Sequence, residues 1–310
     1  MYVMAQLGLD AEIKATAIPF KTFSLKKPNG KTLQENPTTI SVNNELYQSM
    51  GISRARLHKI LSSLISDKIQ LSKNLIAIDG NTLAFEDGTS VSCTSIIAAE
   101  GIHSTLRKQY FPQASLRYSG QSCWRALVDF ELPAEYLNSP AEYWGNGIRF
   151  GCIPVARDKV YFYTTCAQPV CQTIESAKAY LINAFKEFHS PITEIIAATN
   201  NNDIVQHDLW DFTPISSYHK DNLLLIGDAA HAMTPNLGQG AAQSLEDALI
   251  LSRCITATDT HIAAFSAFEK QRIHKVKPLI KMAWRIGQAT NWRNPTVSAV
   301  RNLLISATPK

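Results

Sequence analysis

One stretch of the chain, residues 223 to 248 (LLLIGDAAHAMTPNLGQGAAQSLEDA), constrains the fold more than any other. Its first residues, Leu223 to Ile226, form an apolar run that predicts a buried strand. Gly227 then permits a tight backbone turn, because glycine adopts conformations that other residues avoid. The turn presents Asp228 at the carboxyl end of the strand, where its carboxylate can accept hydrogen bonds from hydroxyl groups. The pattern is typical of an α/β protein with a polar ligand at this strand end.

The second half of this stretch predicts a loop followed by a helix. Pro235 stiffens the loop, and Gly238, Gln239 and Gly240 lead into a helix that begins near residue 241. The first N–H groups of a helix have no partner inside it, so they suit negative charge. We therefore expect the stretch to bind a polyol and a planar, partly anionic ligand. An ordinary α/β turn with a chance Gly-Asp pair is the less favoured alternative.

This stretch resembles the second flavin-binding motif of the FAD-dependent aromatic-ring hydroxylases, the group A flavoprotein monooxygenases, which include relatives of urate hydroxylase, salicylate hydroxylase and zeaxanthin epoxidase. The resemblance implies that Gly227 and Asp228 hold the ribityl or pyrophosphate region of FAD. It also implies that the loop from Pro235 to Gly240, including Gln239, lies against the isoalloxazine ring. The backbone N–H groups of Gly238 and Gly240 would then stabilise negative charge on the reduced ring.

The resemblance covers nearly the whole chain. It implies an α/β fold in which an FAD-binding Rossmann-like domain carries an inserted β-rich substrate domain and C-terminal helices. One part of the family pattern is missing, because no G-x-G-x-x-G occurs in the 310 residues. We therefore expect the FAD-binding domain to be N-terminally incomplete, with a first βαβ unit of roughly 45 to 55 residues lying upstream. Without that unit, the strand ending at Ile226 would lack a neighbour, which leaves backbone groups unpaired.

A second constellation, IIAAEGIHSTLRKQY, occupies residues 96 to 110. It resembles the Asp-Gly motif of the same family, in which a strand ends in an acidic residue and a glycine before a short helix. Glu100 and Gly101 match those two positions and are expected to contact the cofactor, although the family has Asp where this chain has Glu100. Arg107 is expected to provide a fixed cation for a phosphate or a carboxylate. A plain strand-to-helix turn with a surface arginine is the alternative.

A third match is GISRARLHKIL, residues 51 to 61. Ser53 is expected to cap a helix whose apolar residues fall at helical spacing. In the family, an arginine in the first turn of this helix approaches the flavin, and Arg54 occupies the matching place. Taken alone, one arginine at a helix start is more often an ordinary surface residue.

The order of the predicted elements divides the chain into domains. We expect a discontinuous FAD-binding domain of residues 1–112 and 216–290, which includes a peripheral β-hairpin at residues 13–35 around a PNG turn. Residues 113–215 are predicted to form the substrate-binding β-sheet domain. Residues 291–310 are predicted to form a C-terminal helical tail.

Aromatic residues recur in the predicted strands of the second domain. Trp124, Trp144, Phe150 and Tyr163 are candidates to line an apolar substrate pocket. Aromatic residues on strands are more often part of a core, so each of these candidates is weak when taken alone.

Composition excludes several other kinds of protein. The formal charge of +4 and the absence of a dense Lys/Arg cluster give no support to nucleic-acid binding. The six cysteines and eight histidines show no metal-ligand spacing, so we expect reduced thiols and no metal site. No apolar stretch has the length of a membrane span or of a signal peptide, which favours a cytoplasmic protein without stable membrane association.

Two functions remain open from the sequence. The resemblance implies an FAD-dependent monooxygenase that uses NAD(P)H and inserts one oxygen atom of O2 into an aromatic or other unsaturated ring, such as an isoprenoid ring. No acid/base pair or nucleophile stands out, which fits an enzyme whose cofactor carries the difficult chemistry. The alternative is a truncated, non-catalytic relative that binds a small ligand or a partner without functional FAD. Neither the substrate nor the choice between NADH and NADPH follows from these motifs.

Overall fold

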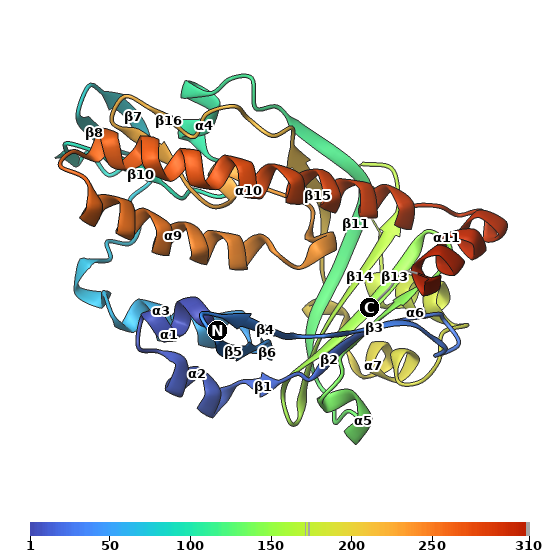
Figure 1. The fold of residues 1–310 in the computed structure, drawn as a ribbon. Coiled ribbons are helices and arrows are strands. Elements are labelled where there is room, and N and C mark those ends of the chain that lie inside the picture. Colours follow the sequence, from blue (N-terminus) through green and yellow to red (C-terminus); the bar gives the residue numbers. More distant parts are fainter. Residues whose placement is uncertain (171, 173, 308–310) are drawn as a thin grey trace. The chain divides into compact units, whose positions relative to one another are not determined.

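The computed structural model describes residues 1–170, 172 and 174–307 (Figure 1). Two compact units make up this chain. The β-sheet unit comprises Met1–Ser63, Tyr118–Leu209 and the described residues from Gly287 onward. The α/β unit comprises Leu64–Arg117 and Trp210–Ile286. A mixed α/β architecture was expected from the sequence and is confirmed.

A seven-stranded sheet forms the β-sheet unit, in the order β15-β11-β14-β13-β12-β2-β3. Its strands are β2 (Thr22–Lys26), β3 (Thr32–Pro37), β11 (Leu116–Asp129), β12 (Ala141–Trp144), β13 (Ile148–Ala156), β14 (Lys159–Ala167) and β15 (Val205–Phe212). Two helices, α6 (Ala177–Phe185) and α7 (Ile192–Ala198), pack on one face and enclose a hydrophobic core with the strands.

The hairpin formed by β2 and β3 joins this sheet through parallel pairing of β2 with β12, in which Ser24 lies opposite Ala141. The expectation that the hairpin is peripheral to the FAD-binding domain is therefore wrong. Residues 13–16 also belong to a helix instead of the hairpin. Pairing between strands more than 100 residues apart depends on tertiary packing, which a local sequence pattern does not reveal.

Smaller elements complete the β-sheet unit. They are α1 (Tyr2–Gln6), α2 (Asp10–Thr16), β1 (Ile18–Pro19), β4 (Thr39–Val42), β5 (Glu45–Gln48), β6 (Met50–Gly51), α3 (Arg54–Ser63), α5 (Ala134–Leu137) and α11 (Pro295–Ala307). The N–H of Arg56 donates to Ser53 Oγ at 3.3 Å, which confirms the cap expected at the start of α3.

The α/β unit contains two three-stranded sheets. The first has the order β10-β17-β16, with β10 (Ile96–Ala98), β17 (Leu223–Leu225) and β16 (His219–Lys220). The second is an antiparallel meander of β7 (Leu75–Asp79), β8 (Thr82–Phe85) and β9 (Ser90–Ser92). The helices are α4 (Thr105–Tyr110), α8 (Asp228–His231), α9 (Gly240–Ala257) and α10 (His261–Thr290), which contains Pro278.

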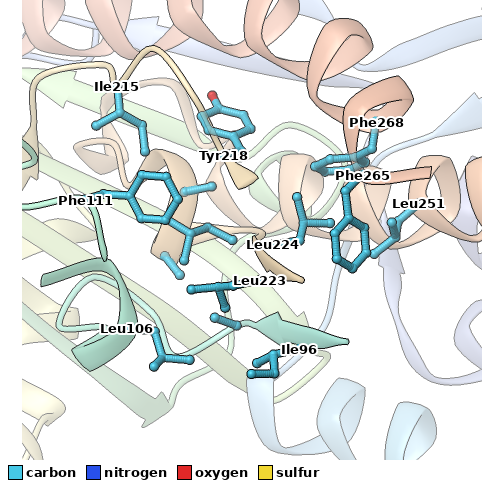
Figure 2. Packing of buried hydrophobic residues seen from close by; sticks show 14 of the residues in the cluster. Ile96, Leu106, Phe111, Ile215, Tyr218, Leu223, Leu224, Leu251, Phe265 and Phe268 are labelled. Carbon is cyan, nitrogen blue, oxygen red and sulfur yellow. The ribbon is translucent and has the colours of Figure 1, made fainter. Parts of the chain in front are cut away.

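The strand β17 lies in the middle of its sheet, with β10 parallel on one side and β16 antiparallel on the other. The expectation that this strand would lack a neighbour is therefore wrong. Its three residues are fully buried, which explains their uninterrupted apolar sequence. Figure 2 shows Leu223 and Leu224 among side chains from β10, α9 and α10, including Ile96, Leu251, Phe265 and Phe268.

No helix in the described part of the chain is long and apolar enough to cross a lipid bilayer. The described cysteines are unpaired thiols, as expected, and most of them are buried. Cys171, the sixth, lies outside the described residues. Within the same residues, no cluster of His, Cys, Asp and Glu side chains could hold a metal ion.

The central strand provides a test of the core. Leu224 is fully buried, whereas Ile97, its register partner on β10, is 45% exposed. We expect Leu224→Ala to lower the free energy of unfolding by about 2 to 5 kcal/mol, because it leaves a cavity in the core. The matched variant Ile97→Ala should change it by about 0.5 kcal/mol or less. Urea unfolding measures both, and equal losses would contradict the assigned burial.

Candidate cofactor site

The turn after β17 has a backbone conformation that requires glycine. Gly227 has φ 56° and ψ −142°, a region that side chains make unfavourable. A Cβ atom at this position would also lie 2.9 Å from Ser244 Oγ. The sequence therefore places glycine here because the chain turns sharply against α9 before Asp228 begins α8.

Asp228 lies at the surface of the α/β unit with an unpartnered carboxylate. The side chain is exposed, and its oxygen atoms make no hydrogen bond or ion pair with the described residues. Crowding by neighbouring protein atoms partly removes water from the carboxylate and raises its pKa above the usual value, while His231 opposes this shift. Such a carboxylate is a strong acceptor available to the hydroxyl groups of a ligand.

The loop before α9 brings a second polar surface close to Asp228. Pro235 starts a short 3-10 helix, Pro235–Leu237, and Gly238 follows with a left-handed φ of 63°. A Cβ atom on Gly240 would lie 3.9 Å from Asp228 Oδ1, so the start of α9 is adjacent to the carboxylate. Gly238 and Gln239 are exposed, as are Ala241 and Ala242 in the first turn of α9.

The first N–H groups of α9 are available for a ligand. In the described chain, no carbonyl or side-chain acceptor bonds the N–H groups of Gly240, Ala241 or Ala242, and the first bonded one belongs to Gln243. An 18-residue helix carries a partial positive charge at this end. The turn and the helix start therefore combine one carboxylate acceptor with several backbone donors in a small exposed area.

Three buried residues that the sequence analysis did not identify support this turn. They are Asp247, His231 and Arg272. Asp247 on α9 accepts a hydrogen bond from the N–H of Gly227 at 2.7 Å, and it also contacts His231 and Arg272. All three side chains are fully buried. The sequence did contain an indication of Asp247. Gln243, Asp247 and Leu251 recur at helical spacing on the buried face of α9, where a charged residue is unusual.

Glu100 acts as a cap for α4 in this structure. Its carboxylate accepts hydrogen bonds from Ser104 Oγ at 2.6 Å and from the N–H groups of Thr105 and Leu106 at 3.3 and 3.2 Å. The additional methylene relative to Asp gives the side chain the reach for these contacts. Gly101 has φ 77°, and no atom lies within 4 Å of a Cβ placed there. Cofactor contact by Glu100 and Gly101 stays a prediction.

The expectation that Arg107 offers a cation to a ligand is corrected. The side chain is fully buried, and its guanidinium donates to the carbonyl oxygens of Gly101, Ile102 and Ala229. It also stacks 4.4 Å from the ring centre of Phe212. Burial lowers the pKa of Arg107. Its contacts instead connect the turn after β10 with the turn after β17.

Arg54 lies at the start of α3 in the β-sheet unit, where its side chain is exposed. Among the described residues, it makes no hydrogen bond or ion pair, and the approach to the flavin that the family resemblance implies stays a prediction.

The four candidate substrate aromatics divide between the two faces of the large sheet. Trp124 and Phe150 are fully buried in the core beneath α6 and α7, which corrects the expectation that they line a pocket. Alternation of side chains along the strands places Trp144 and Tyr163 on the opposite face. There Glu142 accepts hydrogen bonds from Trp144 Nε1 at 2.5 Å, Arg149 at 3.0 Å and the Tyr163 hydroxyl at 2.5 Å.

Gly227 and Gly238, two of the positive-φ glycines of the site, make different demands on a substituted residue. We expect Gly227→Ala to lower the free energy of unfolding by about 1 to 3 kcal/mol from the backbone alone, and further because Ser244 must move. Gly238→Ala, which meets no atom within 4 Å, should lose about 1 to 2 kcal/mol. Urea unfolding of both variants compares them, and a smaller loss for Gly227→Ala would contradict this account of the turn.

Comparison with known proteins identifies the fold and the family. A family model described as FAD binding domain matches residues 1–263. The FAD-dependent urate hydroxylase of Klebsiella pneumoniae is 31% identical over 90% of this chain and 75% of its own length. The 2-heptyl-3-hydroxy-4(1H)-quinolone synthase of Pseudomonas aeruginosa is 29% identical over 94% of this chain and 78% of its own.

Among solved structures, Klebsiella pneumoniae HpxO complexed with FAD and uric acid superposes with a TM-score of 0.86 at 24% identity. The match covers 99% of this chain and 81% of that one, and it shows that the two share a fold. The turn at Gly227 and Asp228 lies within the region that the family model matches. The chain therefore belongs to the FAD binding domain family and is a flavin-dependent monooxygenase.

Proposed function

We propose that this protein binds FAD with its ribityl or pyrophosphate region on Asp228 and uses NAD(P)H and O2 to insert one oxygen atom into an unsaturated ring. The observation that carries the proposal is the carboxylate of Asp228 beside the N–H groups at the start of α9, none of which has a partner among the described residues. Ribityl hydroxyls donate to a carboxylate, and anionic groups accept from helix N–H groups. The residues present therefore fit both kinds of group that FAD carries.

The remaining residues of the site have roles in this proposal. Gly227 sets the position of Asp228, while Pro235, Gly238, Gln239 and Gly240 form the loop against the flavin ring. The exposed backbone of this loop can approach a planar ring closely, because the two glycines carry no side chain. When bound, FAD supplies the redox chemistry and the activation of O2, which no side chain supplies. The protein's own groups bind, orient and shield the reactants.

Three further cofactor contacts rest on the family resemblance. They are Arg54 at the exposed start of α3, and Glu100 with Gly101 at the turn after β10. The open space around Gly101 supports a close approach of the ligand there. The predicted division into an FAD-binding domain and a substrate domain is kept as part of the proposal, although the contacts group residues 1–63 with the large sheet. Cytoplasmic location stays a prediction.

For the substrate, we favour a bicyclic nitrogen heterocycle over a phenolic acid or an isoprenoid ring. The names of two relatives, a urate hydroxylase and a quinolone synthase, support this class. Trp144 and Tyr163 are the candidate contacts, because they share one face of the sheet with the charged side chains of Arg149 and Glu142. Trp144, Arg149 and Glu142 are buried and Tyr163 is half-buried, so they form an aromatic and charged cluster inside the β-sheet unit. Such a cluster suits a flat heterocycle that has both apolar faces and polar edges.

The alternative, a non-catalytic relative without functional FAD, is not favoured. Its motivation was the replacement of Asp by Glu100, and the cap contacts of Glu100 show that the longer side chain fits its turn. The family match also extends through every candidate cofactor residue.

Replacing the Asp228 carboxylate should weaken FAD binding without lowering the stability of the fold. Asp228→Asn should weaken FAD binding about 10- to 100-fold, because it removes hydrogen bonds to a charged acceptor. The folded-state pKa of Asp228 is raised, so ionisation of this group lowers stability as the pH rises from 3.8 through the folded-state value. At neutral pH the variant without FAD should therefore be at least as stable as the wild type.

Fluorescence titration with FAD and thermal unfolding at several pH values measure these two effects. Asp221→Asn is the matched control, because Asp221 is an exposed carboxylate at the opposite end of the same strand. Unchanged FAD affinity in Asp228→Asn, or an equal loss in Asp221→Asn, would remove Asp228 from the site.

The reaction class has a direct test. The FAD-loaded protein should oxidise NAD(P)H faster when a quinolone or uric acid is present, and the ring product should contain one atom from isotopically labelled O2. A saturated ring of similar size is the control and should leave the rate unchanged. If no aromatic or unsaturated ring compound changes the rate, or if no label enters the product, the proposed reaction is wrong.

A further inference from the structure

We propose that Asp247 is a positioning residue for the FAD site, acting with His231 and Arg272 to hold the Gly227–Asp228 turn ready for the cofactor. The proposal rests on the proposed FAD-binding function and deepens it. None of these three side chains contacts the exposed surface of the site, because all are fully buried. Their effect on a ligand must therefore pass through the backbone of Gly227 and the placement of α9.

The contacts converge on one carboxylate. Asp247 Oδ2 accepts from the N–H of Gly227 at 2.7 Å and lies 2.7 Å from His231 Nε2. Asp247 Oδ1 accepts from Arg272 Nε at 2.6 Å. The carboxylate therefore bonds the first residue of the turn, the last residue of α8 and the helix α10 at the same time.

Arg272 extends this network from α10 to α9. Its NH2 group donates to the carbonyl oxygen of Gln243 at 3.2 Å and to Gln243 Oε1 at 2.8 Å, and its NH1 group pairs with Glu246 at 3.0 Å. Removing one partner from a buried charged pair leaves the other charge without compensation, so losing the contacts of Arg272 is costly. Arg272 thus fixes the first two turns of α9 relative to Asp247.

The charge state of Asp247 supports its role as a strong acceptor. Burial alone would raise the pKa of Asp247. The hydrogen bond and charge of His231, the charge of Arg272 and the N–H of Gly227 more than offset burial and hold the pKa below its usual value. The carboxylate is therefore ionised at neutral pH, where its hydrogen bonds are of the strong, charge-assisted kind.

The position of the network ties it to function as well as to stability. Gly227 requires the unusual backbone conformation, and Asp228 follows it immediately. The same helix that carries Asp247 begins at Gly240, beside the Asp228 carboxylate. One buried group therefore sets both the direction of Asp228 and its separation from the N–H groups of α9, and a preformed site binds its ligand more tightly than one that must be ordered.

The test compares Asp247→Asn with a matched control, Glu269→Gln. Asn keeps the size of Asp but loses the charge and presents one NH2 group toward donors. Glu269 lies on α10, as Arg272 does, and like Asp247 it accepts backbone N–H groups, those of Tyr218 at 2.5 Å and His219 at 3.1 Å, but these belong to a different turn. The measurements are thermal unfolding without FAD, FAD affinity by fluorescence well below the unfolding temperature, and the absorption spectrum of bound flavin.

We expect Asp247→Asn to weaken FAD binding about 10- to 100-fold, the range for losing a hydrogen bond to a charged group, and to alter the bound-flavin spectrum. Glu269→Gln should lose thermal stability but keep wild-type FAD affinity and spectrum. Wild-type affinity in Asp247→Asn, or an equal loss of affinity in both variants, would overturn the proposal. A wild-type protein that does not bind FAD would overturn the proposed function, and the positioning role with it.

If Asp247→Asn fails to fold, Arg272→Lys provides the same test in a milder form. Lysine keeps the positive charge, but it cannot donate to Asp247 and Gln243 in the fork geometry of arginine. The folded Arg272→Lys protein should show reduced FAD affinity relative to Glu269→Gln. Equal affinity of those two variants would contradict the proposed role.

Discussion

The sharp turn at Gly227 is the constraint on which the rest of the site depends. Its backbone conformation suits only glycine, and it is held by the buried carboxylate of Asp247, two turns into α9. The fully buried strand β17 fixes the turn on one side, and α9 fixes it on the other. The surface that results is small: one carboxylate and the first N–H groups of a helix, which have no partner in the described part of the chain.

Local sequence patterns were sufficient to predict the elements that carry this site. The apolar run of β17, the glycines of the turn and the loop, and the start of α9 all lie within one short stretch, so no distant contact is needed to place them. The same holds for the Ser53 cap, which bonds a residue three positions along the chain. Flavin binding was inferred from this stretch through its resemblance to a family, and the family match confirms that identification.

What the sequence did not reveal depends on contacts between distant segments. The residues around Trp124 and Trp144 do not indicate which face of the sheet is buried in the core. A shift of one residue in strand register would move each side chain to the opposite face. The pairing of β2 with β12 and the burial of Arg107 against Phe212 are long-range in the same sense. Asp247 was missed because its partners, Gly227 and Arg272, lie 20 and 25 residues away along the chain.

The most direct test of the central claim is a crystal structure of this protein with FAD. The account predicts a hydroxyl group of the ribityl chain, or a group next to it, within hydrogen-bond distance of the Asp228 carboxylate. It also predicts that Gly227 keeps its positive φ and its hydrogen bond to Asp247, because that buried carboxylate holds the turn. A flavin bound away from Asp228, or a turn rebuilt around it, would contradict the account.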